Sequence, residues 1–130
     1  MIIDTSAIVA ILLGEDDAPA IESLIAYAPP SQRLVATPTL VEMYVAMHRK
    51  EGNAGTEILA MLLSRLQLQN IVFETEHYLI ACEAYRRFNR GKTGLNFGDC
   101  FAYALAKARN EPLLCKGNDF KHTDLQLVAY

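Results

Sequence analysis

Short apolar runs alternate along the chain with longer stretches in which apolar residues recur every three or four positions. The short runs are typical of buried β-strands, and the longer stretches are typical of amphipathic helices. We expect strands at 1–4, 33–36, 71–74 and 112–115, a weaker fifth strand at 125–129, and helices at 7–13, 18–27, 38–50, 54–68, 76–88 and 96–109. This alternation predicts the α/β class, with three α/β/α layers around a short parallel sheet of four to five strands.

The chain is expected to form a single domain over residues 1–130. It has no internal repeat, low-complexity segment or linker, and 52% of its residues are hydrophobic while 21% are charged. A chain of this length and composition can fill one core. The net charge is −3, so binding to nucleic acid would require a local basic patch.

Neither the apolar segments nor the cysteines indicate a membrane-bound or secreted protein. The apolar run at 6–14 is well below the roughly 18 residues that span a bilayer, and no basic residue precedes it as in a signal peptide. Cys82, Cys100 and Cys115 are an odd number at spacings that match neither a disulfide framework nor a CxxC metal site. We expect a cytoplasmic protein with no membrane partner and with reduced thiols in its core.

Four carboxylates are expected at the edge of the sheet where the parallel strands have their carboxyl ends. Asp4 closes the first strand, Glu42 lies in the first turns of the helix after the second strand, and Asp119 follows the fourth strand. Asp99 lies in the first turn of the last helix, and it reaches this edge if residues 89–95 carry the chain back. That loop can span roughly 23 Å when extended. The active crevice of such a sheet lies at this edge.

Carboxylates gathered in this way repel one another. At roughly 4 Å the repulsion is about 1 kcal/mol per pair in water and about 4 kcal/mol near a protein surface. A divalent cation would remove this cost. Oxygen ligands with no His or Cys nearby at ligand spacing favour Mg²⁺ or Mn²⁺ over zinc.

Each acid also has a structural interpretation. Asp4 could cap a helix, and Glu42 could be a first-turn acid that the helix dipole favours. Asn96 and Asp99 have the spacing of a capping box, and Asp119 could be an ordinary loop acid. Because four unrelated structural acids have no reason to share one edge, their common position favours a metal site.

Four short motifs carry a resemblance to a known family: IIDTSA at 2–7, VE at 41–42, LNFGDCFAYA at 95–104 and LLCKGNDF at 113–120. In this order and spacing they resemble the PIN-domain ribonucleases, and within that family the VapC toxins of bacterial toxin–antitoxin pairs. The resemblance covers the whole chain.

The resemblance implies which residues form the site. The three core acids of the family correspond to Asp4, Glu42 and Asp99, and its fourth, more variable acid corresponds to Asp119. Related sequences often carry a second acid where this chain has Asn118. Whether residue 118 or residue 119 faces the metal therefore stays open.

The resemblance also implies Mg²⁺-dependent endoribonuclease activity, with Mn²⁺ as a substitute, together with homodimerisation and inhibition by a cognate antitoxin protein. A metal held by Asp4, Asp99 and Asp119 would activate a water molecule in line with an RNA phosphodiester. Glu42 would complete the cluster or orient that water. All four acids are therefore candidate catalytic residues.

Polar residues around the acids are candidate contacts for the RNA substrate. They are Thr5, Ser6, Asn96, Arg86, Arg87, Arg90, Lys92 and Lys116, with Lys121 on the other side of Asp119. The basic side chains could guide RNA phosphates to the acids. Alternatively, Arg86, Arg87 and Arg90 suit the C-terminal end of a helix, and the two hydroxyl residues suit a helix cap.

The histidines and aromatic residues are interpreted as structural. His48, His77 and His122 lack metal spacing and an evident nucleophile partner, so we expect them to be surface or packing residues. The aromatic residues at helical spacing are expected in the core rather than as platforms for bases: Tyr85, Phe88, Phe97, Phe101 and Tyr103.

Other classes with acids at a sheet edge match less well. A phosphoacceptor receiver domain would have adjacent acids after the first strand, and an aspartyl phosphatase would have a second Asp where this chain has Ser6. Two alternatives within the PIN fold remain, an RNA-processing nuclease without an antitoxin and a binding module without catalysis. The compact chain favours the toxin over the first, and the intact acids argue against the second.

Overall fold

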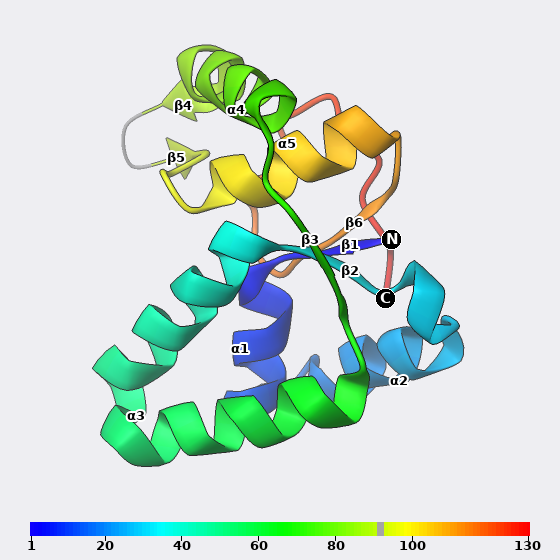
Figure 1. The fold of residues 1–130 in the computed structure, drawn as a ribbon, viewed down its shortest axis with the longest axis vertical. Coiled ribbons are helices and arrows are strands. Elements are labelled where there is room, and N and C mark those ends of the chain that lie inside the picture. Colours follow the sequence, from blue (N-terminus) through cyan, green and yellow to red (C-terminus); the bar gives the residue numbers. More distant parts are fainter. Residues whose placement is uncertain (91–92) are drawn as a thin grey trace.

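Parallel strands form the centre of the molecule (Figure 1). The computed structural model describes residues 1–90 and 93–130, and within them the main sheet has four strands in the order β3-β2-β1-β6. These strands are β1 (Ile2–Ile3), β2 (Leu34–Ala36), β3 (Gln69–Ile71) and β6 (Leu113–Leu114). Ile2 is in register with both Leu34 and Leu113, so β1 lies inside the sheet with a neighbour on each side.

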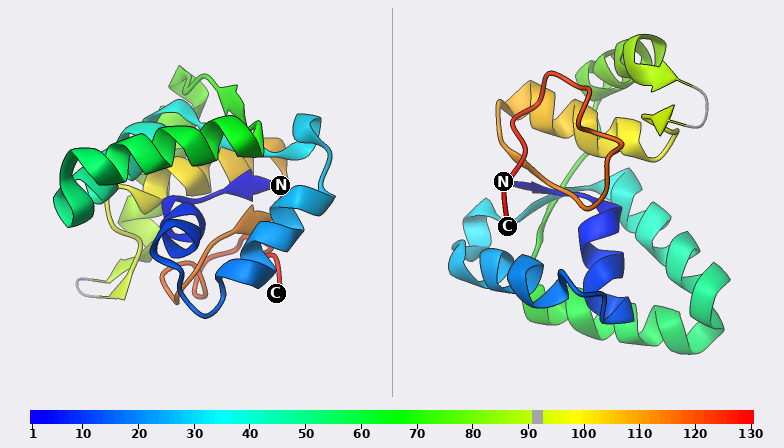
Figure 2. Two further views of the ribbon diagram at one scale, coloured as in Figure 1. Left: turned by 90° about the horizontal axis from the view of Figure 1, so that it is seen from below. Right: turned by 180° about the vertical axis from the view of Figure 1, so that it is seen from behind.

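Helices cover both faces of this sheet (Figures 1 and 2). One face carries α1 (Thr5–Leu13), α2 (Ala18–Tyr27) and α3 (Thr37–Leu66), and the other carries α4 (Thr75–Phe88) and α5 (Asp99–Arg109). A short 3₁₀ turn at Pro30–Gln32 leads into β2. The predicted three-layer α/β/α arrangement is confirmed, with four strands in the sheet.

The alternation of side chains along each strand divides the core into two halves. Ile2 and Leu113 point toward α4 and α5, whereas Ile3, Val35 and Leu114 point toward α1, α2 and α3. Successive side chains of a strand face opposite sides of the sheet. Because both sides are covered, both sets are buried, which explains why the strands appear in the sequence as unbroken apolar runs.

Helix α3 bends sharply at Gly52. This residue has φ 62° and ψ −147°, a conformation that glycine adopts easily and other residues do not. The helices expected at 38–50 and 54–68 are therefore the two arms of α3, which meet at an angle (Figure 1). The first arm carries Glu42 toward the edge of the sheet.

Several boundaries differ from the expected ones. The third strand is at 69–71 rather than 71–74, because pairing with β2 on the edge of the sheet, not apolar character, determines its position. The loop expected at 89–95 contains an antiparallel hairpin of β4 (Asn89–Arg90) and β5 (Thr93–Gly94). The last helix begins at Asp99 rather than Asn96.

The fifth strand expected at 125–129 is reduced to a bridge in the described part of the chain. Leu127 pairs with Leu113 in parallel, and Leu113 exchanges backbone hydrogen bonds with Gln126 and Val128 at 2.9 Å each. This segment touches the edge of the sheet at β6 without extending along it.

Two expectations about burial are wrong in part. Cys100 and Cys115 are buried as expected, but Cys82 is exposed on α4. Among the aromatic residues, Phe88 and Tyr103 are buried and Phe101 is half-buried, whereas Tyr85 and Phe97 lie at the surface. Tyr85 is on the outer side of α4, and Phe97 lies in the turn before α5, where helical spacing does not decide burial. Among the described residues, no helix is both long and apolar enough to cross a membrane.

Candidate active site

Asp4 lies at the carboxyl end of β1 and caps the first turn of α1. Its backbone is extended, and its Oδ2 accepts hydrogen bonds from the Ser6 N–H at 2.9 Å and from the Ser6 hydroxyl at 2.6 Å. The side chain is only 2% exposed, and Oδ1 has no hydrogen-bond partner within the described residues. A buried polar atom without a partner is costly. The cap therefore accounts for one oxygen of Asp4 and leaves the other unexplained.

The loop after β6 fixes the orientation of Asp4 through Ser6. The backbone N–H of Lys116 donates to the Ser6 hydroxyl oxygen at 2.8 Å, and that hydroxyl in turn donates to Asp4. These hydrogen bonds connect the turn after β1 to the loop after β6, two segments that are far apart in the sequence but follow neighbouring parallel strands. Ser6 thus contacts Asp4 through both its backbone N–H and its hydroxyl group.

Glu42 reaches the same region from the first arm of α3. The Thr5 hydroxyl donates to Glu42 Oε2 at 2.7 Å, and the Glu42 side chain is half-buried. Because Thr5 immediately follows Asp4, this hydrogen bond joins the second acid to the first. Burial raises the pKa of Glu42, the Thr5 hydroxyl lowers it, and the charge of Asp4 raises it further.

Asp99 is the first residue of α5 and forms reciprocal hydrogen bonds with Asn96. Asp99 Oδ2 accepts from the Asn96 N–H at 2.7 Å, and Asn96 Oδ1 accepts from the backbone N–H groups of Gly98 and Asp99 at 2.7 and 3.1 Å. These are the bonds of the capping box that the sequence suggested. Like Asp4, the Asp99 side chain is buried and uses one oxygen for its local turn.

The four acids lie near enough to influence one another. Burial, followed by the charges of Asp4, Asp119 and Glu42, raises the pKa of Asp99 to about 7, against the opposing hydrogen bond from Asn96. Burial also raises the pKa of Asp4, which the bonds from Ser6 counteract and the charge of Asp119 reinforces. The acids that follow β1 and β6 and those that lie on α3 and α5 therefore do meet at one edge of the sheet, as expected.

Residues 118 and 119 can now be distinguished. The charge of exposed Asp119 acts on both Asp4 and Asp99, whereas Asn118 lines a separate hollow beside the C-terminal segment. Asp119 is therefore the better candidate for the fourth acid. Among the described residues, however, no three His, Cys, Asp or Glu side chains are yet arranged around one point as metal ligands. Glu42 Oε2 and Asp99 Oδ2 are turned instead to donors of the protein.

Gly98 makes room for Glu42, a role that the sequence did not suggest. A Cβ atom at Gly98 would overlap the carboxyl group of Glu42, although the backbone of Gly98 is ordinarily helical (φ −67°, ψ −43°). Because any residue can adopt this conformation, the backbone alone gives no reason for a glycine here. Its signal in the sequence is its position inside the motif LNFGD at 95–99.

The basic candidates are arranged differently from one another. Arg86 is paired with Glu83 through two hydrogen bonds at 2.6 and 2.8 Å, and Arg87 lies over the Phe88 ring and 3.6 Å from Asp124. Arg90 is exposed at the hairpin, and Lys92 lies outside the described residues. The pairing of Arg86 and Arg87 agrees with their alternative role at a helix end, and their contact with RNA stays a prediction.

The Lys116 side chain is paired with acids of the protein itself. Its ammonium group lies 2.5 Å from Glu15 and 3.2 Å from Asp17, in the turn between α1 and α2. These ion pairs hold the loop that precedes Asp119 against the turn that follows the C-terminal end of α1. Lys121 remains exposed.

Comparisons with known proteins agree with this arrangement. A family model described as the PIN domain matches residues 1–125. Ribonuclease VapC30 of Mycobacterium tuberculosis is 39% identical to the chain over 131 residues, covering 99% of this chain and 98% of that protein.

Solved structures share the fold at lower identity. Mycobacterium tuberculosis VapC20, described as a sarcin-ricin loop cleaving toxin, matches with a TM-score of 0.77 and 17% identity, covering 98% of this chain and 97% of the other. A toxin–antitoxin complex from Klebsiella pneumoniae matches with a TM-score of 0.71 and 18% identity, covering 99% of this chain and 97% of the other.

The family match over nearly the full length and the acids at the sheet edge define a PIN-domain nuclease. The chain belongs to the PIN-domain family and, within it, to the VapC ribonucleases. This confirms the family and the ribonuclease activity that the four motifs implied. PIN-domain ribonucleases are metal-dependent enzymes in general.

In the metal-free protein, Asp99→Asn should stabilise the fold, and more so at high pH. The pKa of Asp99 is near 3.8 in the unfolded chain and about 7 in the fold, so the folded state binds this proton more tightly. The free energy of unfolding therefore falls as the pH rises from about 4 to about 7, and the penalty persists above that range. We expect a gain of about 1–2 kcal/mol at about pH 8 and little gain near pH 4, measured by urea unfolding in EDTA.

The matched control for this measurement is Asp16→Asn, which removes an exposed carboxylate in the turn between α1 and α2. It should change stability by about 0.5 kcal/mol or less at either pH. An equal gain for Asp99→Asn at both pH values would contradict the raised pKa.

Gly98→Ala should reduce ribonuclease activity by at least about tenfold without unfolding the protein. The added methyl group displaces the Glu42 carboxyl group, while the helical backbone accepts alanine readily. Gly14→Ala is the control, because its φ of 62° strains alanine but nothing lies within 4 Å of the new methyl group. That variant should lose about 1 kcal/mol of stability and keep its activity. Near-normal activity of Gly98→Ala would show that the position of Glu42 is unimportant.

Proposed function

We propose that this chain is a Mg²⁺-dependent endoribonuclease that hydrolyses RNA phosphodiester bonds as the toxin of a toxin–antitoxin pair. The observation that carries the proposal is the unpartnered, buried Oδ1 of Asp4 next to three further carboxylates. Such a group is costly in the free chain. It is expected where a bound cation completes the site.

The residues fit a metal that prefers oxygen ligands. We assign the metal to Asp4, Asp99 and Asp119, with Glu42 completing the acidic cluster. Cys100 and Cys115 lie nearby, but burial raises the pKa of their thiols to about 11 and about 12, which disfavours thiolate ligands. Hard oxygen donors favour Mg²⁺, with Mn²⁺ as a substitute, over zinc.

In this mechanism the protein holds the acids and positions the attacking water. When bound, the cation supplies positive charge that offsets the repulsion among the acids and stabilises the charge developing on the phosphate. The Thr5 hydroxyl holds Glu42 Oε2, so that Oε1 can accept a hydrogen bond from the water. The raised pKa of Glu42 suits it to take the proton that the water loses.

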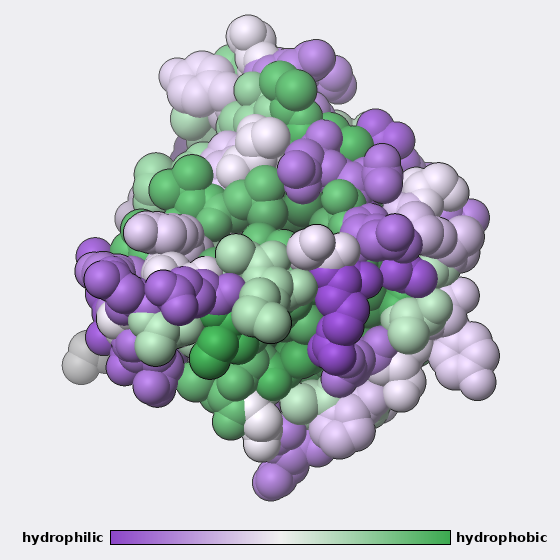
Figure 3. All heavy atoms as spheres, turned by 60° about the horizontal axis from the view of Figure 1, so that its bottom comes forward, coloured by the Kyte–Doolittle hydropathy of each residue, from purple (hydrophilic) through white to green (hydrophobic). Residues whose placement is uncertain are grey.

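The surface suits association with protein partners. Large apolar side chains are exposed along α3 and α4, among them Val41, Ile58, Met61 and Leu79. Apolar side chains also gather across the middle of one face, with hydrophilic ones around them (Figure 3). Such patches mark interaction sites. The similar Klebsiella pneumoniae structure is a toxin–antitoxin complex, which supports an antitoxin as one partner.

We therefore propose two protein contacts, a second copy of the chain in a two-fold dimer and a cognate antitoxin. The antitoxin would lay an apolar segment on the exposed surface and direct a basic side chain to the acids. That basic group would replace the charge of the cation and stop cleavage. With RNA as its substrate, the enzyme would act in the cytoplasm.

Asp4→Asn and Asp99→Asn should each reduce RNA cleavage by at least about a hundredfold while the fold is retained. Each substitution removes an anionic oxygen ligand and relieves repulsion among the acids. Cleavage of a labelled RNA in Mg²⁺, with circular dichroism of each variant, measures both effects. Asp16→Asn should cleave at the normal rate. If either site variant cleaves normally while EDTA still stops the reaction, the cluster has been assigned to the wrong residues.

Mg²⁺ or Mn²⁺ should raise the melting temperature of the parent chain more than that of Asp99→Asn. A ligand at about 100 times its dissociation constant stabilises the folded state by about 2.7 kcal/mol. Differential scanning fluorimetry with and without millimolar metal measures the shift, and zinc should not be required. A melting temperature that ignores Mg²⁺ in the parent chain would argue against metal binding at this edge.

A further inference from the structure

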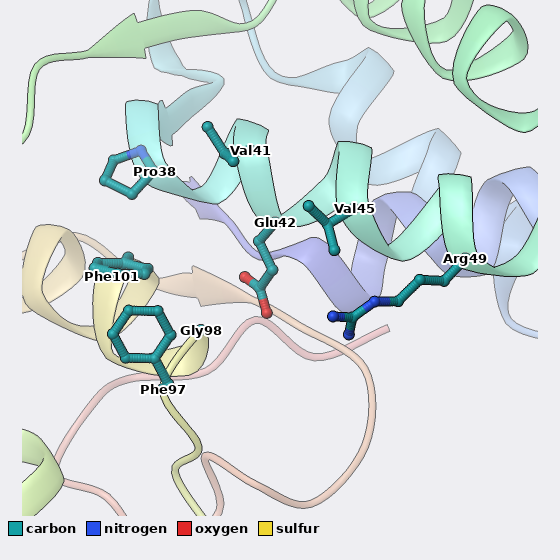
Figure 4. Close-up of a pocket in the computed structure, with 8 residues that line it drawn as sticks. All are labelled: Pro38, Val41, Glu42, Val45, Arg49, Phe97, Gly98 and Phe101. Atoms are coloured by element: carbon teal, nitrogen blue, oxygen red, sulfur yellow. The ribbon is translucent and has the colours of Figure 1, made fainter. Parts of the chain in front are cut away.

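A cavity opens directly beside Glu42, between the first arm of α3 and the start of α5. Its volume is about 530 Å³, within the range of small-ligand sites. Val41 and Val45 form the α3 wall, Phe97 and Phe101 form the opposite wall, and the Glu42 carboxyl group lies between them (Figure 4). The cavity is therefore apolar on its sides and ends at an acid of the proposed active site.

Phe97 offers an aromatic surface at this cavity. Its side chain is 76% exposed, although an aromatic residue of this size is usually covered. The ring packs against Phe101 in a T-shaped contact with centroids 5.0 Å apart, and Phe101 packs in the same way against Phe73 at 5.3 Å. These contacts hold the Phe97 ring from one side and leave the rest of it accessible to a planar ligand.

Arg49 supplies a positive charge to the same cavity. It lies two turns after Glu42 on α3, and its guanidinium group extends back along the helix toward the Glu42 carboxyl group (Figure 4). No ion pair or hydrogen bond of Arg49 is present among the described residues, whereas Arg86 and Lys116 are paired with acids. This guanidinium group is available to bind an anion.

The position of Phe97 relates the cavity to the reaction. Phe97 precedes Asp99 by two residues, so their Cα atoms are at most about 7 Å apart. This distance is close to the spacing of neighbouring nucleotides along a strand. An RNA phosphate placed at the acids would therefore present an adjacent base to Phe97.

We propose that this cavity is a subsite for one unpaired nucleobase of the RNA substrate, next to the scissile phosphate. The base stacks on Phe97 and faces the apolar wall of α3, while Arg49 pairs with the neighbouring phosphate. Aromatic stacking together with an arginine is the combination by which proteins bind single-stranded nucleic acid. This inference rests on the proposed ribonuclease function and adds that the cleaved RNA is single-stranded at this point.

The apolar character of the cavity is also compatible with a protein segment, but two features favour RNA. The guanidinium group of Arg49, which has no acid partner among the described residues, favours an anionic ligand over a wholly apolar protein segment. The cavity is also continuous with the acids, because Glu42 belongs to both. RNA that reaches the acids along this cavity would pass the Phe97 ring, which is part of its lining.

The test uses a single-stranded oligoribonucleotide and the Asp99→Asn background, in which RNA can be bound without being cut. Fluorescence anisotropy measures affinity for Phe97→Leu, which keeps an apolar side chain but removes the ring, and for Phe97→Trp, which keeps a ring. We expect about tenfold weaker binding for Phe97→Leu and near-parent binding for Phe97→Trp. Tyr27→Leu is the control, because Tyr27 is a 90% exposed aromatic residue on α2.

Arg49 has its own readout in the same assay. Arg49→Gln should weaken binding and reduce the slope of log affinity against log salt by about 0.7, the value for one phosphate contact on a single strand. Arg49→Lys should restore most of the slope, since it restores the charge. An unchanged slope for Arg49→Gln overturns the phosphate contact.

Light scattering is run on every sample, so that variants are compared in the same oligomeric state. If Phe97→Leu binds RNA like the parent but weakens dimerisation, the cavity is a protein interface and the proposal is wrong. If Phe97→Leu binds RNA as well as its Asp99→Asn background does, and the same substitution in the parent chain leaves cleavage in Mg²⁺ at the parent rate, the subsite is refuted and the ribonuclease function stands. If the parent neither binds nor cleaves RNA, both are overturned.

Discussion

The burial of the Asp4 carboxyl group is the constraint on which the rest of the site depends. Asp4 directly follows the inner strand β1, which has β2 on one side and β6 on the other, so its side chain is excluded from water. A carboxylate in such a place needs donors or a cation. Ser6 satisfies one oxygen, and the same turn delivers Thr5 to Glu42. The surrounding polar contacts can thus be understood as responses to one buried charge.

Much of this arrangement is predictable because it follows from the periodicity of apolar residues and from the order of strands and helices along the chain. The apolar pairs at 2–3 and 113–114 must be strands buried on both faces, and each is followed by polar residues at the same edge of the sheet. Asn96 and Asp99 are close in sequence, so their reciprocal hydrogen bonds follow from spacing alone. Local rules were sufficient for the Asp4 cap and for the reciprocal bonds of Asn96 and Asp99.

The features that escaped prediction depend on contacts between distant segments. The overlap that a side chain at Gly98 would make with Glu42 involves residues more than fifty positions apart, and the pairing of Lys116 with Glu15 spans a hundred. The exposure of Phe97 depends on how the turn before α5 leaves the core, which apolar periodicity does not describe. Similarly, β3 lies at 69–71 rather than at the expected 71–74, because pairing with β2 outweighs the apolar character of Val72.

The hydrogen bond from the loop after β6 to Ser6 has a consequence for how this site tolerates sequence change. Its donor is the backbone amide of residue 116 and not the lysine side chain. Nineteen of the twenty amino acids carry that N–H, so the side chain at this position can diverge while the orientation of Asp4 is preserved. Proline alone lacks the donor. Substitutions that remove the ion pairs of residue 116 can therefore leave the orientation of Asp4 unchanged.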